Sequence, residues 1–327
     1  MRAIVLKQYG DPKTSLRLEE FPTPVPRRGE VLVKITASPF HPADMAFIAG
    51  YYGIRRPLPT VPGLEATGTV VAHNAGLHGQ YLMGKRVACS APNDAPGPWA
   101  EFMAVSAINC APLKRQTSDE FGATLLINPL TALAQLNLVR DGGNPAFIQT
   151  AAGSALGRMI ARLAADRGVP AIHVVRRADA AEALRAAGTA NVLSSDTADF
   201  AARLKELAGR LKATIAFDAV GGEMTETLAA AMPPRSKVVV YGGLSGQSPR
   251  LSLPDAIFAE KVVEGFWVPH YLRKVGMLRA LRMIGEVQRL GEARLGTKIL
   301  AKLPLERIDE AIAMQSRGTE GKVLLVP

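Results

Sequence analysis

Short apolar runs separated by proline- and glycine-rich turns occupy the first 122 positions of the chain. We expect β-strands where apolar and polar residues alternate and β-branched residues are frequent, as at 2–10, 29–38, 66–73, 84–91 and 100–107. The segments between them, such as PTPVPRRGE and APNDAPGP, carry strong turn signals. The pattern predicts a β-rich, barrel-like first domain.

The pattern changes near position 145, where continuous aliphatic runs begin to alternate with amphipathic stretches. Leu156, Ile160, Leu163 and Ala164 lie at helical spacing, and 179–188 and 197–210 are two further helical stretches. Strands that are buried on both faces are apolar throughout, as are most of the residues at 146–151, 171–176, 190–195, 213–220 and 237–243. The alternation predicts a doubly wound α/β domain built on a parallel sheet.

The last part of the chain is a helical stretch at 275–291 and an apolar strand at 321–327. Because a closing strand needs a sheet to join, we expect the C-terminus to return to the first domain. The expected domains are therefore 1–122 with 269–327 for the β-rich part, and 123–268 for the α/β part.

The composition is typical of a globular enzyme. The chain has 327 residues, of which 48% are hydrophobic and 21% charged, and this length suits two domains. Its two cysteines, Cys89 and Cys110, lie in apolar runs outside any C-x-x-C motif, so we expect buried thiols. The N-terminal segment alternates like a strand rather than a signal peptide, and no apolar run approaches the ~18 residues of a membrane span. We expect a soluble, cytoplasmic protein that does not bind membranes.

The net charge of +10 favours an anionic partner, but the basic residues are dispersed along the chain. No basic arm or basic stripe with interleaved aromatic residues is present, which argues against nucleic acid as a partner. Small pairs such as Arg55-Arg56, Arg176-Arg177 and Arg273-Lys274 suit a phosphorylated small molecule or an acidic carrier protein better.

The segment IQTAAGSALGRM at 148–159 lies where a dinucleotide-binding turn is expected, between a strand and a helix. The three glycines of the usual G-x-G-x-x-G pattern are replaced here by Ala152, Ser154 and Gly157. Alanine and serine are small enough to approximate the first two, and Gly157 allows the helix to pack on the strand. Two interpretations remain open here: a dinucleotide site, or a Rossmann-shaped domain without one.

Arg176 and Arg177 follow the next strand, about where an NAD enzyme places an acidic residue for the ribose hydroxyls. Guanidinium groups suit the 2′-phosphate of NADPH, which makes NADPH the expected cofactor. The alternative is a pair of solvated arginines at the end of a strand. Asp179 and Glu182 are interpreted as a cap that opens the following helix.

Four further motifs extend over the whole chain, namely HPADMAFIAGYYG, INPLTAL, YGGLSG and EGFWVPHY. With them the chain resembles the medium-chain dehydrogenase/reductase superfamily, and within it the zinc-free trans-2-enoyl thioester reductases of the mitochondrial type. The resemblance implies a GroES-like catalytic domain, which the C-terminus completes, and a Rossmann domain.

The resemblance also implies site residues. The catalytic phenol falls on Tyr52, with Tyr51 as the alternative, and a third possibility is that both are loop aromatics without a catalytic role. His41 in the same segment is either a proton relay or a structural histidine. The expected cofactor residues are Asn128, Thr131, Gly153, Ser154, Ala155, Leu156, Gly157, Arg176, Arg177, Tyr241, Gly242, Gly243, Leu244, Phe266, Trp267 and Lys322.

The segment PGLEATG at 62–68 departs from the reductase pattern and is closer to the related quinone oxidoreductases. Zinc-dependent relatives need metal ligands where this chain has Phe40 and Leu64, so we expect no metal site. The first hypothesis is NADPH-dependent reduction of an enoyl thioester, on coenzyme A or an acyl carrier protein. The alternatives are a quinone or enone reductase, and an NADPH-binding protein without catalysis. By resemblance, the segment 262–268 is the edge strand of a homodimer.

Overall fold

A computed structural model describes residues 1–316 and 321–327. The chain forms two compact units, one made of 1–129 with 284–327 and the other of 130–283. The first boundary lies close to the expected one, whereas the second lies later in the chain than position 268. The reason is that the segment after 268 packs on the second unit: the Tyr271 ring contacts Phe266, and Arg279 forms an ion pair with Asp141.

The first unit is built on an antiparallel sheet with one parallel pair. Its strand order is β14-β15-β3-β4-β5-β7, with β6 paired to β3. The strands are β3 (Glu30–Pro39), β4 (Glu65–His73), β5 (Arg86–Ser90), β6 (Phe102–Ser106), β7 (Cys110–Pro112), β14 (Ile299–Pro304) and β15 (Lys322–Val326). A separate hairpin pairs β1 (Arg2–Leu6) with β2 (Leu16–Glu20).

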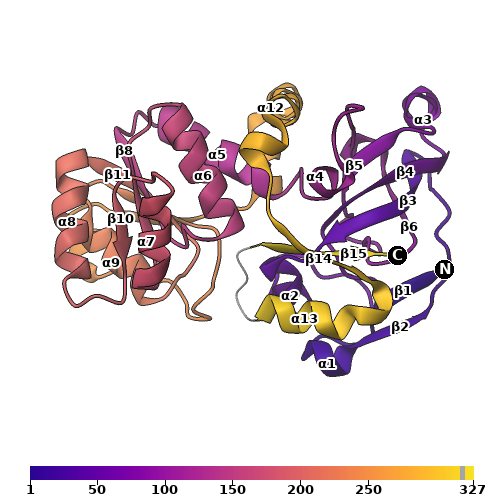
Figure 1. Ribbon diagram of the computed structural model, residues 1–327, viewed down its shortest axis with the longest axis horizontal. Helices are drawn as coiled ribbons and strands as arrows, with labels where there is room; N and C mark the ends of the chain where they lie inside the picture. Colours follow the sequence, from indigo (N-terminus) through magenta and orange to yellow (C-terminus); the bar gives the residue numbers. More distant parts are fainter. Residues whose placement is uncertain (317–320) are drawn as a thin grey trace. The chain divides into compact units, whose positions relative to one another are not determined.

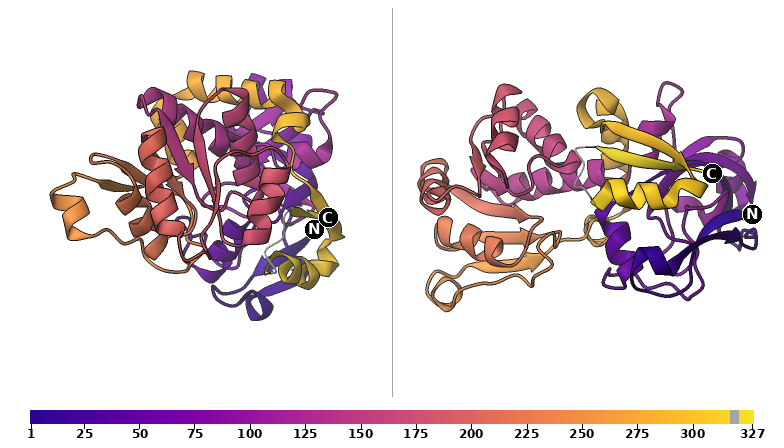
Figure 2. Two further views of the ribbon diagram at one scale, coloured as in Figure 1. Left: turned by 60° about the vertical axis from the view of Figure 1, so that its left-hand side comes forward. Right: turned by 60° about the horizontal axis from the view of Figure 1, so that its bottom comes forward.

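The C-terminal strand returns to the first unit, as the sequence predicts. Strand β15 pairs antiparallel with β3, and both views of Figure 2 show the yellow C-terminal strands beside the violet N-terminal ones. The inner face of this sheet is lined by Val31, Val33, Val87, Met103 and Val105, all at most 1% exposed. Cys89 and Cys110 face each other in the β5–β7 register as buried free thiols.

Short helices connect the strands of the first unit. They are α1 (Pro12–Ser15), α2 (Pro42–Ala49), α3 (Gly76–Leu82), α4 (Asp119–Ala123) and α13 (Ile308–Ser316), with 3₁₀ turns η1 (Ala107–Asn109) and η2 (Leu305–Arg307). Helix α2 begins after His41 and ends at Gly50, whose φ of 89° is a left-handed conformation that glycine adopts without strain. The Tyr51–Tyr52 segment follows directly.

The second unit contains a six-stranded parallel sheet with the strand order β10-β9-β8-β11-β12-β13. These strands are β8 (Ala146–Gln149), β9 (Ala171–Val175), β10 (Val192–Ser194), β11 (Ala213–Asp218), β12 (Lys237–Val240) and β13 (Val262–Gly265). The order reverses between β8 and β11, and ligands of doubly wound folds bind at this switch point. The predicted fold class is therefore confirmed.

Helices cover both faces of the parallel sheet, as Figure 1 shows with α8 and α9 on one side and α6 on the other. Ile172 and Val174 of β9 pack in the core below α8 and α9, while the next residue, Val175, packs on the opposite face with Leu184 of α7. The helices are α5 (Asn128–Asp141), α6 (Ala155–Asp166), α7 (Ala178–Ala186), α8 (Phe200–Leu211), α9 (Glu223–Ala231), α10 (Leu253–Ile257), α11 (Val268–Val275) and α12 (Met277–Leu295). None of the helices in the described part of the chain has the length and apolar character that a membrane crossing requires.

Candidate functional site

The turn between β8 and α6 has the geometry of a nucleotide-binding turn, although only one of its glycine positions is conventional. The left-handed conformation that glycine normally supplies is adopted by Ala151, with a φ of 50°. The sequence interpretation assigned the tight turn to Ala152, one residue later, so that assignment is corrected. Ser154 caps α6, because its Oγ accepts a hydrogen bond of 3.0 Å from the Gly157 N–H.

Gly157 is required where it stands. A Cβ at this position would lie 2.6 Å from both the Ala151 carbonyl oxygen and the Ala152 Cα. Helix α6 therefore lies directly against the turn, which is the close helix–strand approach that the sequence predicts. A Cβ on Gly153, by contrast, would meet nothing closer than Val175 at 3.7 Å.

The turn is also held by a buried polar pair, Gln149 and His173, which the sequence analysis did not identify. Gln149 Nε2 lies 2.6 Å from His173 Nδ1 and donates to the Gly157 carbonyl oxygen at 3.0 Å. Burial lowers the pKa of His173 to about 4, so its imidazole is neutral near pH 7 and accepts from the amide. Gln149 lies on β8 and His173 on β9. Each is a polar residue inside an otherwise apolar strand, and this sequence feature could have identified the pair.

The two arginines after β9 differ in their contacts. Arg177 donates to both carboxylate oxygens of Asp179, each at 2.9 Å, and this contact lowers the pKa of the Asp179 carboxyl group. Among the described residues, the Arg176 guanidinium has no ion-pair partner, and its side chain is exposed. The N-cap of α7 is Arg177 rather than Asp179, so the predicted cap at Asp179 and Glu182 is wrong. Asp179 lies in the first turn of α7, where a carboxylate interacts favourably with the helix dipole.

Asp218, at the carboxyl end of β11, organises the loops at the switch point. Its carboxylate accepts hydrogen bonds from the hydroxyls of Thr150 and Thr225 and from the backbone N–H groups of Val220 and Gly221, at 2.7–3.1 Å. Neither Asp218 nor Thr150 was singled out from the sequence. Asp218 is an acidic residue near the end of the expected strand at 213–220, and this sequence feature could have identified it.

The predicted cofactor segment at Tyr241, Gly242, Gly243 and Leu244 begins directly after β12 at the same edge of the sheet. The Tyr241 N–H donates to the Asp218 carbonyl oxygen, and the Leu244 N–H to the Ala219 carbonyl oxygen. A Cβ on Gly242 would lie 2.8 Å from that Ala219 oxygen, so this position requires glycine. Burial raises the pKa of the Tyr241 phenol, which stays protonated.

The remaining expected residues of the second unit are Thr131 on α5, Ala155 and Leu156 on α6, and the Phe266–Trp267 segment. The Phe266 N–H continues the sheet by donating to the Val240 carbonyl oxygen at 2.8 Å, and Trp267 is the N-cap of α11. Both aromatic side chains are half-buried. Thr131 is buried at 6% exposure.

In the first unit, the structure distinguishes the two candidate tyrosines. Tyr51 is 84% exposed, whereas Tyr52 is half-buried. The nearby Arg56 is buried at 2% exposure, and its guanidinium donates to the carbonyl oxygens of Pro92, Val61 and Gly63. Arg56 is therefore neither a solvated arginine nor a phosphate ligand, because its donors are committed to backbone carbonyl oxygens at 61, 63 and 92.

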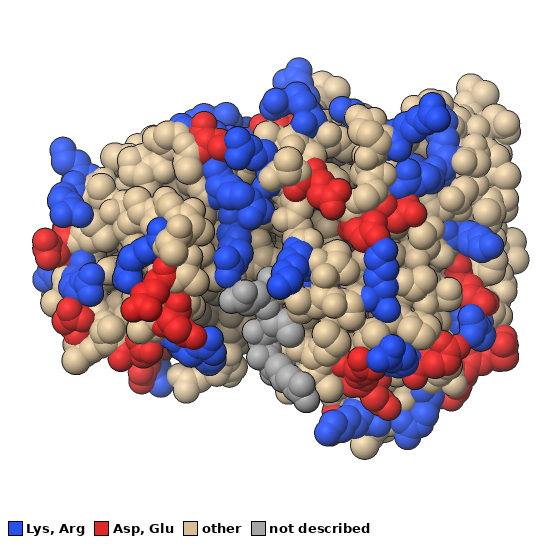
Figure 3. Space-filling view, viewed as in Figure 1, with Lys and Arg blue, Asp and Glu red and all other residues tan. Residues whose placement is uncertain are grey.

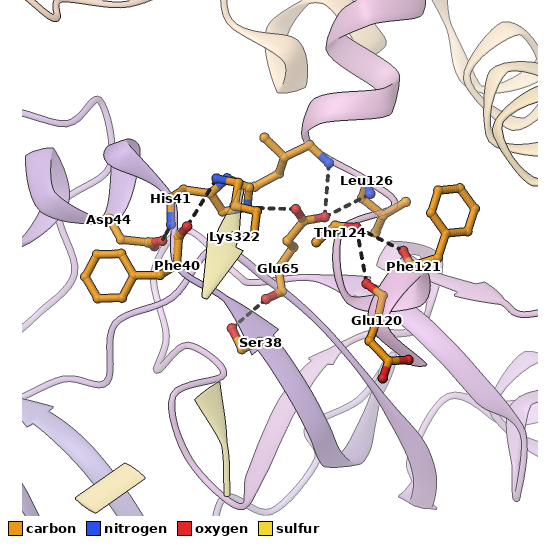
Figure 4. A network of polar contacts seen from close by, with 11 residues as sticks. Ser38, Phe40, His41, Asp44, Glu65, Glu120, Phe121, Thr124, Leu126 and Lys322 are labelled. Carbon is orange, nitrogen blue, oxygen red and sulfur yellow. Dashed lines mark hydrogen bonds and ion pairs between the residues drawn. The ribbon is translucent and has the colours of Figure 1, made fainter. Parts of the chain in front are cut away.

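The same unit contains a buried network of titratable side chains, which Figure 4 shows. His41 Nε2 lies 2.8 Å from Glu65 Oε1, and His41 Nδ1 lies 2.8 Å from Lys322 Nζ. The second carboxylate oxygen of Glu65 accepts the backbone N–H groups of Leu126 and Ile127 at 2.8 and 3.1 Å. All three side chains are at most 4% exposed.

Burial sets the charge states in this network. It lowers the pKa of His41 to about 3, with the Lys322 ammonium acting in the same direction, so the imidazole is neutral. It raises the pKa of Asp44, which accepts from the His41 backbone N–H, to about 6. Burial also raises the pKa of Glu65, and this effect exceeds the lowering by the two backbone donors and Lys322. The sequence analysis did not identify Glu65, and it left the role of His41 open.

Asn128 and Lys322, both expected to contact the cofactor, belong to the first unit. Asn128 is the first residue of α5 and is 9% exposed. The Lys322 ammonium donates to the Phe40 carbonyl oxygen at 3.1 Å in addition to its contact with His41. Their roles toward a cofactor stay predictions.

The two positions expected to lack metal ligands are occupied by buried apolar side chains. The Phe40 ring packs on Trp99 at a centroid distance of 4.8 Å, and Leu64 is 6% exposed. In the described residues, no group of three histidine, cysteine, aspartate or glutamate side chains is arranged to hold a metal ion.

Comparison with known proteins defines the class. The model of the alcohol dehydrogenase GroES-like domain matches residues 27–115, and that of the zinc-binding dehydrogenase matches residues 155–282. The chain belongs to the medium-chain dehydrogenase/reductase superfamily. The resemblance stated from the sequence motifs is thus confirmed.

Among the relatives are mitochondrial enoyl-[acyl-carrier-protein] reductases. The Arabidopsis thaliana protein is 30% identical over 90% of this chain and 79% of its own length, and a Caenorhabditis elegans protein is 30% identical over 98% and 93%. Solved structures similar to this chain include a Mesorhizobium loti protein described as an NADPH:quinone reductase, with a TM-score of 0.93, 31% identity, and coverage of 100% of this chain and 98% of that one. A mycobacterial protein solved in complex with NADPH has a TM-score of 0.85 and 27% identity, with both chains fully covered.

Proposed function

We propose that this protein reduces the carbon–carbon double bond of 2-enoyl thioesters, using NADPH. The protein is an NADPH-dependent oxidoreductase, as its superfamily membership and its NADPH-binding structural neighbour support. The thioester substrate is supported by the similarity to enoyl-[acyl-carrier-protein] reductases over most of the chain. The observation that carries the proposal within the molecule is the half-buried Tyr52, because the reaction needs a positioned proton donor.

The residues at the switch point fit a dinucleotide. Gly157 lets α6 lie against the turn, so that the first N–H groups of this helix are directed at the turn, where anions are favoured. Gly153 leaves open space where a side chain would otherwise stand. We propose that Gly153, Ser154, Ala155 and Leu156 hold the pyrophosphate, and that Tyr241–Leu244, Phe266, Trp267 and Thr131 complete the part of the site that the second unit supplies. We propose Asn128 and Lys322 of the first unit as further cofactor contacts.

The ribose 2′-phosphate is assigned to the two arginines, with unequal shares. The Arg177 guanidinium is engaged by Asp179, which supports Arg176 as the main phosphate contact. Asp179 does not disqualify NADPH, because its charge is balanced by Arg177.

When bound, NADPH supplies the hydride that goes to the β-carbon of the substrate. The negative charge then moves to the thioester oxygen, and the α-carbon must take up a proton. A phenol has a reference pKa of about 10, so Tyr52 is protonated at neutral pH and can donate to the developing oxyanion or to the α-carbon. Solvent then reprotonates the tyrosine, and the cycle is balanced.

The test measures NADPH oxidation with crotonyl-CoA, with the same acyl group on an acyl carrier protein, and with a 1,4-quinone. We expect a preference for the thioesters, and a kcat lower by 10²–10⁴-fold in Tyr52→Phe, the usual range for loss of a general acid. Tyr51→Phe is the matched control because Tyr51 is exposed, and it should retain activity. If the two variants behave alike, Tyr52 is not the proton donor.

Quinone or enone reduction is the second candidate. It is favoured by the PGLEATG segment and by the similarity to the Mesorhizobium loti protein described as an NADPH:quinone reductase. Faster turnover of the quinone than of either thioester would establish it. NADPH binding without turnover of any of these substrates would support a non-catalytic role instead.

We also propose a homodimer formed through β13. This strand ends the parallel sheet, so its second edge has no partner strand in the described chain. Next to it lie the exposed side chains of Leu253, Ile257, Phe258 and Val262, at 48–81% exposure. An unpaired edge beside exposed apolar side chains is typical of an interface. Phe258→Glu should produce a monomer in analytical ultracentrifugation, while Ile108→Glu, at a similarly exposed position in the other unit, should not.

An acidic carrier protein fits the segment that follows Trp267. Positions 265–285 contain no aspartate or glutamate, while Arg273, Lys274 and Arg282 are exposed there together with Met277 and Leu278. Figure 3 shows basic and acidic side chains side by side over much of one face, together with a run of basic side chains that has few acidic neighbours. We expect the carrier-bound substrate to have a lower KM than the coenzyme A thioester at low salt.

The cytoplasmic location of the protein stays a prediction.

A further inference from the structure

Glu65 connects two segments that are far apart in the sequence, one leading to the expected catalytic residue Tyr52 and the other to the expected cofactor residue Asn128. One carboxylate oxygen contacts His41, which precedes α2, and the other accepts the N–H groups of Leu126 and Ile127, which directly precede Asn128. Figure 4 shows the carboxylate between these two segments. A displacement of Glu65 would therefore disturb both segments together.

Helix α2 transmits the position of His41 to Tyr52. The helix is fixed at its start by the hydrogen bond from the His41 backbone N–H to the Asp44 carboxylate, at 2.7 Å. At its end, the backbone N–H groups of Tyr51 and Tyr52 both donate to the Ala46 carbonyl oxygen, at 3.0 and 3.2 Å. Because α2 has only eight residues, a shift at its start moves the tyrosines as well.

Lys322 determines which nitrogen of His41 carries the proton. An ammonium group can only donate, so the Lys322 contact makes Nδ1 the acceptor. The neutral ring then carries its proton on Nε2, which donates to Glu65. Each donor and acceptor is thereby fixed: Lys322 donates to His41, and His41 donates to Glu65. Glu65 also accepts from the backbone N–H groups at 126–127.

We propose that Glu65, His41 and Lys322 form a positioning network that holds Tyr52 and Asn128 in the geometry that the reaction requires. The proposal rests on the proposed function, in which these two residues act on substrate and nicotinamide.

Stability alone gives no reason for these residues. Burial removes the hydration of polar and charged groups, so a buried hydrogen-bonded network contributes little net stability, and apolar side chains of similar size often serve as well or better. The same part of the fold accommodates buried Phe40 and Leu64, so an apolar filling is available to it. Besides the three members, the charged group that acts on the network is Asp44, on which Arg56 acts in turn, and neither one connects the two segments.

The experiment compares Glu65→Gln, His41→Leu and His41→Gln with wild type. His41→Leu removes both hydrogen bonds, whereas the His41→Gln amide can still donate toward Glu65. Lys261→Met is the matched control, because Lys261 is a buried lysine like Lys322 but lies in the other unit, where it donates to the Asp255 carboxylate and the Ala229 carbonyl oxygen. For each protein we would measure the melting temperature, the NADPH Kd, and kcat and KM with the acceptor that wild type reduces best.

We expect kcat to fall by roughly 100-fold in Glu65→Gln and His41→Leu, as displacements of about 1 Å cause, while the NADPH Kd changes less than threefold. His41→Gln should recover part of kcat. Lys261→Met should lower the melting temperature without lowering kcat. The proposal is overturned if the folded network variants keep kcat within threefold of wild type, or if kcat falls equally in Lys261→Met.

The design also separates this proposal from the function on which it rests. If wild type reduces a quinone but no thioester, the proposed substrate is wrong, and the network is still tested by kcat with the quinone. If Glu65→Gln and His41→Leu do not fold, Glu65→Asp decides, because it keeps the carboxylate but is one methylene too short to reach both His41 and the backbone N–H groups at 126–127. Unchanged kcat and KM in that variant contradict the network, and a lower kcat at unchanged NADPH affinity supports it.

Discussion

Replacement of Gly157 by alanine tests the close approach of α6 to the nucleotide-binding turn. The added Cβ would lie 2.6 Å from two backbone atoms of the turn, where ordinary contacts are at least 3.4 Å. Backbone cannot rotate away as a side chain does, so the helix or the turn must shift. Overpacking of this kind costs about 1–3 kcal/mol, and the higher helix propensity of alanine offsets up to about 1 kcal/mol. We expect a net loss of about 1 kcal/mol.

Two other glycines supply controls. Gly209 lies inside α8 with nothing within 4 Å of an added Cβ, so Gly209→Ala should stabilise the protein by about 0.5–1 kcal/mol. Gly153→Ala meets only Val175 at 3.7 Å and should leave the stability unchanged. Because Gly153 is expected at the pyrophosphate, this variant should nevertheless weaken NADPH binding.

The assays are thermal unfolding and titration of NADPH fluorescence. For a unit of this size, a change of 1 kcal/mol corresponds to about 2–4 °C in Tm. Gly157→Ala should therefore melt about 2–4 °C below wild type and bind NADPH more weakly, while Gly209→Ala should melt about 1–4 °C above wild type. A Gly157→Ala protein that melts at the wild-type temperature and binds NADPH normally would refute the assigned backbone contact.

The remaining predictions concern His173 and the arginine pair. His173 has a pKa of about 4 in the folded protein, whereas its usual value of 6.5 applies to the unfolded chain. Because the unfolded chain binds the proton more readily, the free energy of unfolding is unaffected at neutral pH and decreases as the pH falls from about 6.5 toward 4. By pH 5 the loss from this residue should reach about 2 kcal/mol, and urea unfolding of His173→Gln should show a shallower loss with acid than wild type; parallel curves would contradict this. Arg176→Ala should weaken NADPH binding by about 1–3 kcal/mol and NADH binding hardly at all. Arg177→Ala, which leaves Asp179 unpaired near the site, should also reduce the preference for NADPH, and equal losses of both cofactors in either variant would argue against a phosphate contact at that arginine.

Much of the strand order could be predicted because strands leave a local pattern. The expected strands overlap β1, β3, β4, β5 and β6 in the first unit and β8 to β12 in the second, whereas β2, β7 and β14 were not predicted. The need of a final strand for a sheet correctly placed β15 beside β3. Gly157 was recognised because its spacing from the strand is a local property. The cap at Asp179 was wrong because a competing ion pair with Arg177 uses its carboxylate.

By itself, then, the sequence determined the two-unit architecture, the family, and the segments that carry the candidate cofactor and catalytic residues. Only the tertiary structure decided that Tyr52 is shielded while Tyr51 is exposed, that Arg56 is committed to backbone carbonyls, and that Glu65, His41 and Lys322 meet. The physical reason is distance along the chain. Secondary structure depends on neighbours within a few residues, whereas burial and the pairing of charges depend on segments such as 41, 65 and 322, which only folding brings together.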